Sequence, residues 1–180
     1  NGKEVYRITR HTDWVTAIAF SPDGKQIATG DRAGNLYLSS ANGGGILLSL
    51  ANHKGAVRSL AWRSDSRLLA SAGDDGRLIW WNTETGFVAM QNTSPHPPSR
   101  PQGFTGKLPN GVLSVAFRRD GLVVSTGRDN HIRAWKTNSQ QPYSMPLSSG
   151  TPIQVAVGHK GKKHIVGDSL GVVHFWTIDK

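Results

Sequence analysis

The chain has 180 residues, 37% of them hydrophobic, with 21 glycines, 9 prolines and no cysteine. This length and composition suit a globular β protein with a sizeable core, and the absence of cysteine excludes a disulfide framework, a thiolate metal site and a thiol nucleophile. The formal charge of +9 favours acidic partners or simply a solvated basic surface, and no apolar run approaches the roughly 18 residues of a membrane span.

One motif recurs along the chain. Residues 4–9 are interpreted as an isolated strand, and the motif follows at residues 12–24. It returns at residues 54–66 and 111–121, and in a degenerate form at 152–161. A period of roughly forty residues, built from short strands, indicates a repeat architecture.

The second copy shows the plan of the repeat most clearly. Residues 57–62 alternate apolar and polar side chains, which predicts a half-buried strand. Two more strands are predicted at 67–72 and 77–82, joined by an Asp-Asp-Gly hairpin turn at 74–76, and a fourth begins at 87–90. Because no stretch of the chain has a helical period, the sequence predicts a repeated four-stranded antiparallel meander.

The copies share a register at two positions. One position, in the first strand, and another, at the end of the third strand, can be aligned through all four copies. They are occupied by Phe20, Trp62, Phe117 and Val157, and by Ser39, Trp81, Trp135 and Trp176.

A proline-rich insertion, residues 93–108, separates the second and third copies. Proline cannot donate to a strand ladder, so this segment is expected to be a loop. Its prolines at 95, 97, 98 and 101 suit a polyproline conformation. Two interpretations stay open, a ligand segment for an aromatic groove and a tolerated surface loop.

The repeats resemble the blades of WD-repeat β-propellers. That family places a His before the first strand, an Asp in the turn between the second and third strands, and Trp-Asp at the end of the third. Copy two matches best, with His53, Asp75 and Trp81, although Asn82 replaces the last Asp. The resemblance implies that these side chains join a Ser or Thr in a buried structural network, so His53 and Asp75 are read as a structural tie and not as a catalytic dyad.

The other copies depart from the family pattern. Copy three has Asp129 and Trp135 but no histidine. Copy one has His11, with Ala33 at the Asp position, and copy four keeps only Trp176.

The resemblance implies an all-β propeller domain over residues 1–180. The blades are placed at about 11–52, 53–92, 109–150 and 151–180, with 1–10 as the outer strand of a closing blade. Because the family implies seven or eight blades, four WD-type repeats are expected to be half or part of a ring. Two arrangements stay open. Two chains pair head to tail, each N-terminal strand completing the other's fourth blade, or further blades lie on a longer or separate polypeptide.

One face of the propeller is implied to be the recognition face, because it carries the loops that lead into the first strands and the turns between second and third strands. The residues predicted to bind a partner there are Trp14, Arg32, Asp74, Arg128 and Ser169. An exposed Trp flanked by Arg is typical of protein-binding hot spots, whereas the alternative is that Trp14 packs on a neighbouring blade.

The opposite face is basic. Its rim of strand turns carries Lys25, Arg63, Arg67, Arg118, Arg119, Lys160, Lys162 and Lys163. A phosphate-tracking surface would use such charges, but the interleaved aromatics of single-strand binders are missing, which favours solvated turns.

The sequence offers no chemistry beyond binding. His159 and His164 flank a turn, but adjacent lysines oppose a cation, and no carboxylate pair or phosphate loop is present. We therefore expect no catalytic residue, metal or cofactor, and a non-enzymatic scaffold that presents a propeller face to a peptide or protein. Binding of nucleic acid or an anionic surface through the basic rim is the alternative, and an enzyme with a site in the central channel is the least favoured.

Overall fold

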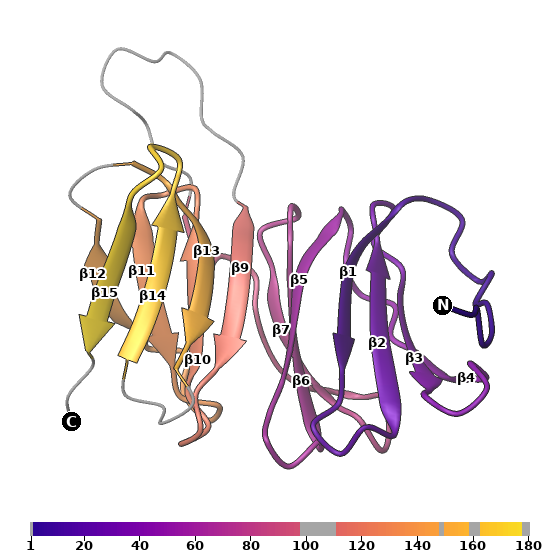
Figure 1. Ribbon diagram of the computed structural model, residues 1–180. Coiled ribbons are helices and arrows are strands. Elements are labelled where there is room, and N and C mark those ends of the chain that lie inside the picture. The colour runs from indigo at the N-terminus through magenta and orange to yellow at the C-terminus, as the bar shows by residue number, and fades with distance from the viewer. Residues whose placement is uncertain (1, 98–110, 148–149, 159–162, 178–180) are drawn as a thin grey trace.

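The computed structural model describes residues 2–97, 111–147, 150–158 and 163–177 (Figure 1). Every regular element within these ranges is a β-strand. The strands form four antiparallel sheets in chain order, which we call blades 1 to 4. The predicted all-β fold of antiparallel blades is thus confirmed.

Blades 1 and 2 each have four strands in sequence order. Blade 1 comprises β1 (Val15–Phe20), β2 (Gln26–Asp31), β3 (Leu36–Ser40) and β4 (Ile46–Ser49). Blade 2 comprises β5 (Val57–Trp62), β6 (Leu68–Gly73), β7 (Leu78–Asn82) and β8 (Val88–Asn92). Tight turns with left-handed residues join the strands, such as Gly76 at φ 73° between β6 and β7.

Blade 3 has four strands and blade 4 has three among the described residues. Blade 3 comprises β9 (Val112–Phe117), β10 (Val123–Gly127), β11 (His131–Trp135) and β12 (Tyr143–Pro146). Blade 4 comprises β13 (Pro152–Val157), β14 (Lys163–Asp168) and β15 (Val173–Thr177).

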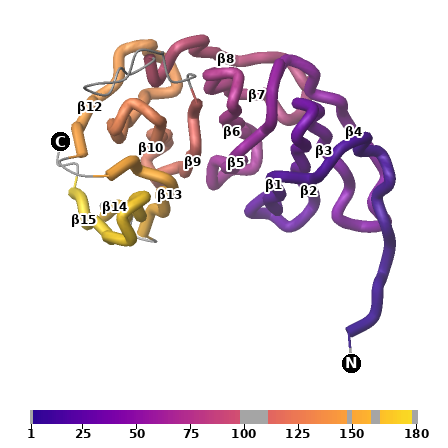
Figure 2. Tube along the Cα trace, turned by 90° about the horizontal axis from the view of Figure 1, so that it is seen from above, coloured from indigo at the N-terminus to yellow at the C-terminus, as the bar shows by residue number. Residues whose placement is uncertain are grey.

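The blades stand side by side in an open arc. Seen from above, the first strands β1, β5, β9 and β13 line the inner side of the arc, and β4, β8 and β12 lie toward its outer side (Figure 2). Successive first strands contact one another, β1 with β5, β5 with β9, and β9 with β13. The two ends of the arc do not meet, so the ring stays open in the single chain.

The hydrophobic core is divided among the three junctions between blades. Between blades 1 and 2, for example, Leu36 and Leu38 pack against Ile79 and Trp81. Similar clusters join blade 2 to blade 3 and blade 3 to blade 4. The middle strands carry small residues, and β6 is buried throughout, because each is covered on both faces by neighbouring blades.

Residues 2–10 form no strand in the single chain, unlike the strand that the sequence predicts at 4–9. The segment, which we call the N-terminal arm, instead lies along blade 1, where the Tyr6 hydroxyl donates to the carbonyl of Ala41 at 2.8 Å. The assignment of 1–10 to a closing blade stays a prediction.

Candidate functional site on the upper face

The upper face of the arc, at the top of Figure 1, is built from the loops that precede β1, β5, β9 and β13 and from the turns that follow β2, β6, β10 and β14. Loops on a rigid scaffold are where binding residues concentrate, because they are positioned without being needed for the core. All five predicted partner-binding residues lie on this face: four of them form two groups, and Ser169 stands apart in the turn that follows β14 of blade 4.

Trp14 and Arg32 form the first group. Trp14 is 74% exposed, so in this chain it does not pack on a neighbouring blade. The Arg32 guanidinium lies 5.7 Å from the centroid of its ring, a cation–π arrangement. The backbone fixes both residues, since the Arg32 amide donates to the Trp14 carbonyl at 2.9 Å and Asp13 accepts from the Trp14 amide at 2.7 Å.

Asp74 and Arg128 belong to the second group, which spans blades 2 and 3. One Asp74 oxygen accepts from Arg58 Nε at 2.9 Å, and the other accepts from Arg128 Nη2 at 3.2 Å. Two guanidinium groups thus share one carboxylate, which leaves this part of the face net positive. Sequence reasoning missed Arg58, whose only signal was its polar position in the alternating first strand.

Ser169 stands apart from both groups. Its hydroxyl accepts a hydrogen bond from the Thr151 amide at 2.9 Å, and its amide donates to the Thr151 carbonyl. Ser169 therefore serves a local turn in blade 4. The prolines at 98 and 101 of the predicted insertion lie outside the described residues.

Beneath the turn of blade 2, four side chains form a buried chain of hydrogen bonds. His53 Nδ1 lies 3.1 Å from both Asp75 oxygens, and His53 Nε2 lies 2.7 Å from the Ser71 hydroxyl. Trp81 Nε1 donates to the same hydroxyl at 2.8 Å. Asp75 also accepts the amide of Lys54, so the chain ties the turn to the loop before β5.

Blade 3 contains the same arrangement, which corrects the expectation that its repeat lacks a histidine. His96 Nδ1 lies 2.7 Å from Asp129, and His96 Nε2 lies 2.8 Å from the Ser125 hydroxyl, which also accepts from Trp135. His96 belongs to the proline-rich insertion, which the sequence predicts to be a loop, either a ligand segment or a tolerated surface loop. Arg133 adds an ion pair to Asp129.

Blades 1 and 4 form the tie differently. In blade 1, His11 bonds Asp31 at 2.9 Å and Thr29 at 2.7 Å, so the acid comes from the end of β2 and Ala33 is not needed. In blade 4, Asp168 stands at the equivalent place and bonds His174 at 3.0 Å. Trp176 Nε1 is buried there and has no hydrogen-bond partner among the described residues, because no serine stands opposite it.

Burial and hydrogen bonding act in opposite directions on the pKa of His96 and of Asp129. Burial lowers the pKa of His96 below its ordinary 6.5, despite the hydrogen bond that the ring donates to Asp129, so the imidazole is neutral at pH 7. Burial alone would raise the pKa of Asp129, but its bonds to His96 and Arg133 hold it below its ordinary value. A neutral histidine clamped between a carboxylate and a serine stabilises a turn, and its lack of exposure keeps it from a substrate.

The described residues of the predicted basic rim lie on the lower face. Arg63 pairs with Asp65 at 2.8 Å, and Arg67 lies 3.7 Å from Glu84. Arg118 is 6% exposed and pairs with Asp120 at 3.0 Å. Lys25, Arg119 and Lys163 are exposed, whereas Lys160, Lys162 and His159 lie outside the described residues. Three of the six described rim residues are thus engaged by acids of the chain itself.

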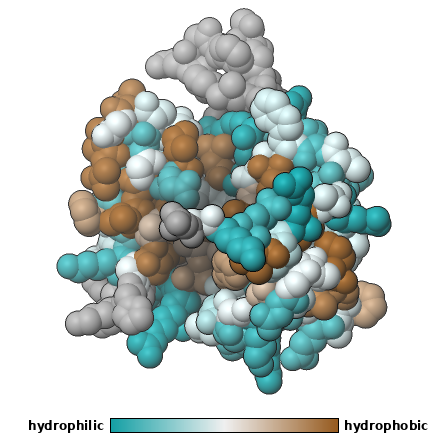
Figure 3. Space-filling model, turned by 45° about the vertical axis from the view of Figure 1, so that its right-hand side comes forward, coloured by the Kyte–Doolittle hydropathy of each residue, from teal (hydrophilic) through white to brown (hydrophobic). Residues whose placement is uncertain are grey.

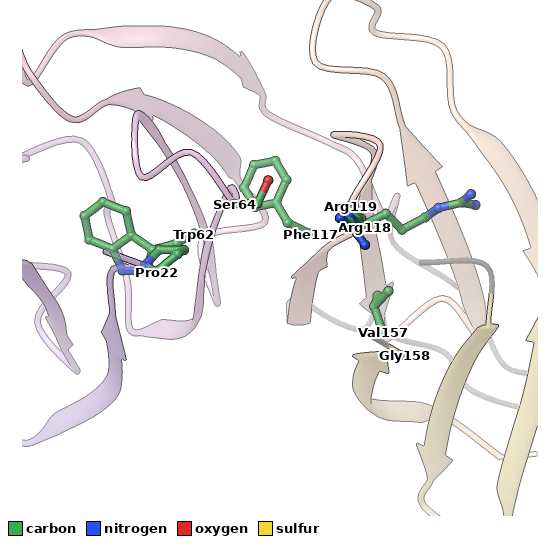
Figure 4. Close-up of a pocket in the computed structure, with 8 residues that line it drawn as sticks. All are labelled: Pro22, Trp62, Ser64, Phe117, Arg118, Arg119, Val157 and Gly158. Carbon is green, nitrogen blue, oxygen red and sulfur yellow. The ribbon is translucent and has the colours of Figure 1, made fainter. Parts of the chain in front are cut away.

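A pocket of about 430 Å³ opens where the lower turns meet the inner side of the arc. Pro22 and Trp62 lie on one side of it and Val157 and Gly158 on the other, with Phe117 between them (Figure 4). It is lined by residues of all four blades, so it marks the middle of the arc.

Residues 2–97, 111–147, 150–158 and 163–177 contain no cluster of three metal-ligating side chains. They also contain no helix with the length and hydrophobicity to span a bilayer.

The comparisons with known proteins agree with the repeat pattern of the chain. The family model for the "WD domain, G-beta repeat" matches residues 2–38, 44–82 and 100–136. An uncharacterized WD repeat-containing protein of Schizosaccharomyces pombe is 29% identical over 135 residues, covering 73% of this chain and 20% of its own length. The pre-rRNA-processing protein crb3/ipi3 of the same yeast is 23% identical over 164 residues, covering 88% and 37%. The chain thus spans between a fifth and two fifths of these relatives.

Among solved structures, a chain from the crystal structure of the mitotic checkpoint complex superposes with a TM-score of 0.78 at 21% identity. The match covers 94% of this chain and 51% of that one. At this identity the likeness concerns the fold.

Proposed function

Because the chain belongs to the WD-repeat family, whose model matches three of its repeats, we propose that it is a non-enzymatic scaffold whose upper face binds an acidic peptide segment of a partner protein. Propellers of this family generally mediate contacts between proteins. The choice of face and of partner chemistry rests on the side chains described above.

The observation that carries the proposal is the exposed, fixed Trp14 with Arg32 stacked beside it. Tryptophan and arginine dominate the energetics of protein interfaces, and a side chain held in place before binding loses little entropy on binding. The backbone bonds at Trp14 and Arg32 provide that preorganisation.

The charge of the face selects the partner. Arg32 and Arg128 project from turns of blades 1 and 3, and Arg58 projects from β5 of blade 2 between them. Asp74 is the acid bound between Arg58 and Arg128. A carboxylate-bearing peptide lying across these blades would meet a positive potential along its length. Arg58 and Arg128 could then exchange part of their contact with Asp74 for the partner's carboxylates.

A catalytic role has less support, because the histidines that pair with carboxylates are buried in structural ties. The lower basic rim also has less support as an anion site, since the acids Asp65, Glu84 and Asp120 already engage three of its arginines.

A phage-displayed random peptide library, selected on the immobilised chain, tests the proposal. The enriched peptides should be rich in Asp and Glu, and Trp14→Ala or Arg32→Ala should weaken them at least about tenfold, as expected for a hot spot. Phe87→Ala is the matched control, because Phe87 is 76% exposed in a lower turn.

Enriched peptides that bind the Trp14→Ala and Phe87→Ala variants equally well would contradict the proposal. A second arm uses a random single-stranded oligonucleotide in a salt titration. Tight, salt-dependent binding that is lost in Arg119→Ala and kept in Trp14→Ala would instead support the lower rim.

A further inference from the structure

The outer face of blade 4, which points away from blade 3, is apolar and uncovered. Val173 is 57% exposed and Phe175 76% exposed in β15. The equivalent residues of blade 2, Leu78 and Trp80, are both 0% exposed, because blade 3 covers them. The equivalents in blades 1 and 3 are likewise at most 1% exposed, namely Leu36, Leu38, Ile132 and Ala134.

Blade 1, at the opposite end of the arc, also has an exposed apolar face. Ile18 is 66% exposed and Phe20 63% exposed on the face of blade 1 that has no preceding blade. Trp62, the equivalent of Phe20, is 8% exposed, because it packs into the junction with blade 1. Figure 3 shows that hydrophobic surface does reach the outside of the molecule in several brown patches between polar regions.

The N-terminal arm sits where the fourth strand of a preceding blade would sit. A methyl group added at Gly44 would lie 2.7 Å from the Tyr6 ring and 3.1 Å from Ile8. At Gly86, the equivalent position of blade 2, the neighbours are Leu48 and Leu50 of blade 1's outer segment. The arm therefore makes, against blade 1, the contact that blade 1's own fourth strand makes against blade 2.

At the other end, β15 pairs only with β14 among the described residues. The corresponding strands β3, β7 and β11 each pair with a fourth strand. An open edge strand beside an exposed apolar face is a template for another strand. The arm and β15 lie at opposite ends of the arc, so one chain does not pair them with each other (Figure 2).

We propose that two copies of this chain close one ring head to tail, each arm adding to β15 of the other copy. The junction needed is one that the chain already forms three times between its own blades. One end presents an uncovered face and an unpaired strand, and the other end presents the matching face and an extra strand. Two such contacts satisfy both ends at once with closed twofold symmetry.

The mass of the 180-residue chain in solution, measured by light scattering, gives the first test. The expected value is twice the 19.5 kDa of one chain. Phe175→Asp and Phe20→Asp should each lower the mass toward that of one chain, whereas Phe87→Asp, at the same 76% exposure as Phe175, should leave it unchanged. All three positions are exposed in the single chain, so circular dichroism should show an unchanged fold.

Mixing the two variants tests the head-to-tail geometry. Phe175→Asp keeps an intact blade 1 face, and Phe20→Asp keeps an intact blade 4 face, so the mixture restores one undamaged junction. The mixture should therefore recover paired chains that neither variant forms alone.

A wild-type mass of one chain would overturn the proposal and favour blades supplied by a different polypeptide. If Phe175→Asp still forms pairs, the contact between the copies does not use the exposed face of blade 4. If the two variants stay single when mixed, the contact is not head to tail. Either result would overturn the proposal.

Discussion

The buried chain Trp81–Ser71–His53–Asp75 makes a quantitative prediction for Ser71→Ala. Asp75 fixes the proton of His53 on Nδ1, so Nε2 accepts from the Ser71 hydroxyl, and the same hydroxyl accepts from Trp81 Nε1. Removing it leaves a donor and an acceptor unpaired in a site where Ser71 is 0% and Trp81 2% exposed. At about 1–3 kcal/mol for each orphaned group, the free energy of unfolding should fall by about 2–6 kcal/mol.

Ser39→Ala is the matched control. Ser39 occupies the tryptophan position of blade 1, is 0% exposed, and its hydroxyl has no hydrogen-bond partner within the described part of the chain. Removing an unsatisfied buried hydroxyl should be neutral or slightly stabilising. Urea unfolding of both variants at one protein concentration, followed by tryptophan fluorescence, measures the difference. Equal changes in the two variants would refute the assignment of Ser71 as the centre of the tie.

Three more predictions follow from the same structure. Gly127→Ala should destabilise the fold by several kcal/mol, because its methyl group would lie 2.2 Å from His96 Cγ, whereas Gly167→Ala, with no neighbour within 4 Å, should be tolerated in thermal unfolding. Burial lowers the folded-state pKa of His96 from its ordinary 6.5, so as the pH falls the unfolded chain takes up the proton before the folded chain does. The free energy of unfolding measured in urea should therefore be constant above about pH 6.5 and decrease below it. The decrease should be smaller in His96→Gln. Asp74→Asn should cost only about 0.5–1 kcal/mol in the same assay, because its arginine partners are partly exposed, and a loss above about 3 kcal/mol would contradict this.

Much of the fold could be predicted from the sequence, because strand alternation and turn chemistry are local. The Asp-Asp-Gly turn of blade 2 forms the hairpin expected of it, with Gly76 in the left-handed region. His53, Asp75 and Trp81 stand at the spacing typical of the family, and the structure brings them together. The N-terminal arm was harder, since a strand needs a neighbour, and the neighbour proposed for it belongs to a second chain.

The histidine of blade 3 could not be found by spacing. His53 precedes Asp75 by 22 residues, whereas His96 precedes Asp129 by 33. The extra residues form a proline-rich segment, whose composition indicates only that it is not a strand. The imidazole of His96 occupies the space beside Gly127, where any side chain on residue 127 would collide with the ring. This space forms only when the blade has folded, so no pattern of neighbouring residues in the sequence indicates it.

The acid of the tie can come from two positions, and sterics explain why they exclude each other. In blades 2 and 3 the acid stands two residues beyond a glycine, and a methyl group at Gly73 would lie 2.9 Å from His53 Nδ1. In blade 1 the aspartate stands at the glycine's own position, and Asp31 reaches the same nitrogen of His11 at 2.9 Å. The position at the end of the second strand therefore carries either the acid itself or a glycine. It follows that a repeat judged by its Asp position alone, as at Ala33, is scored as degenerate although its histidine bonds both an acid and a hydroxyl, Asp31 and Thr29.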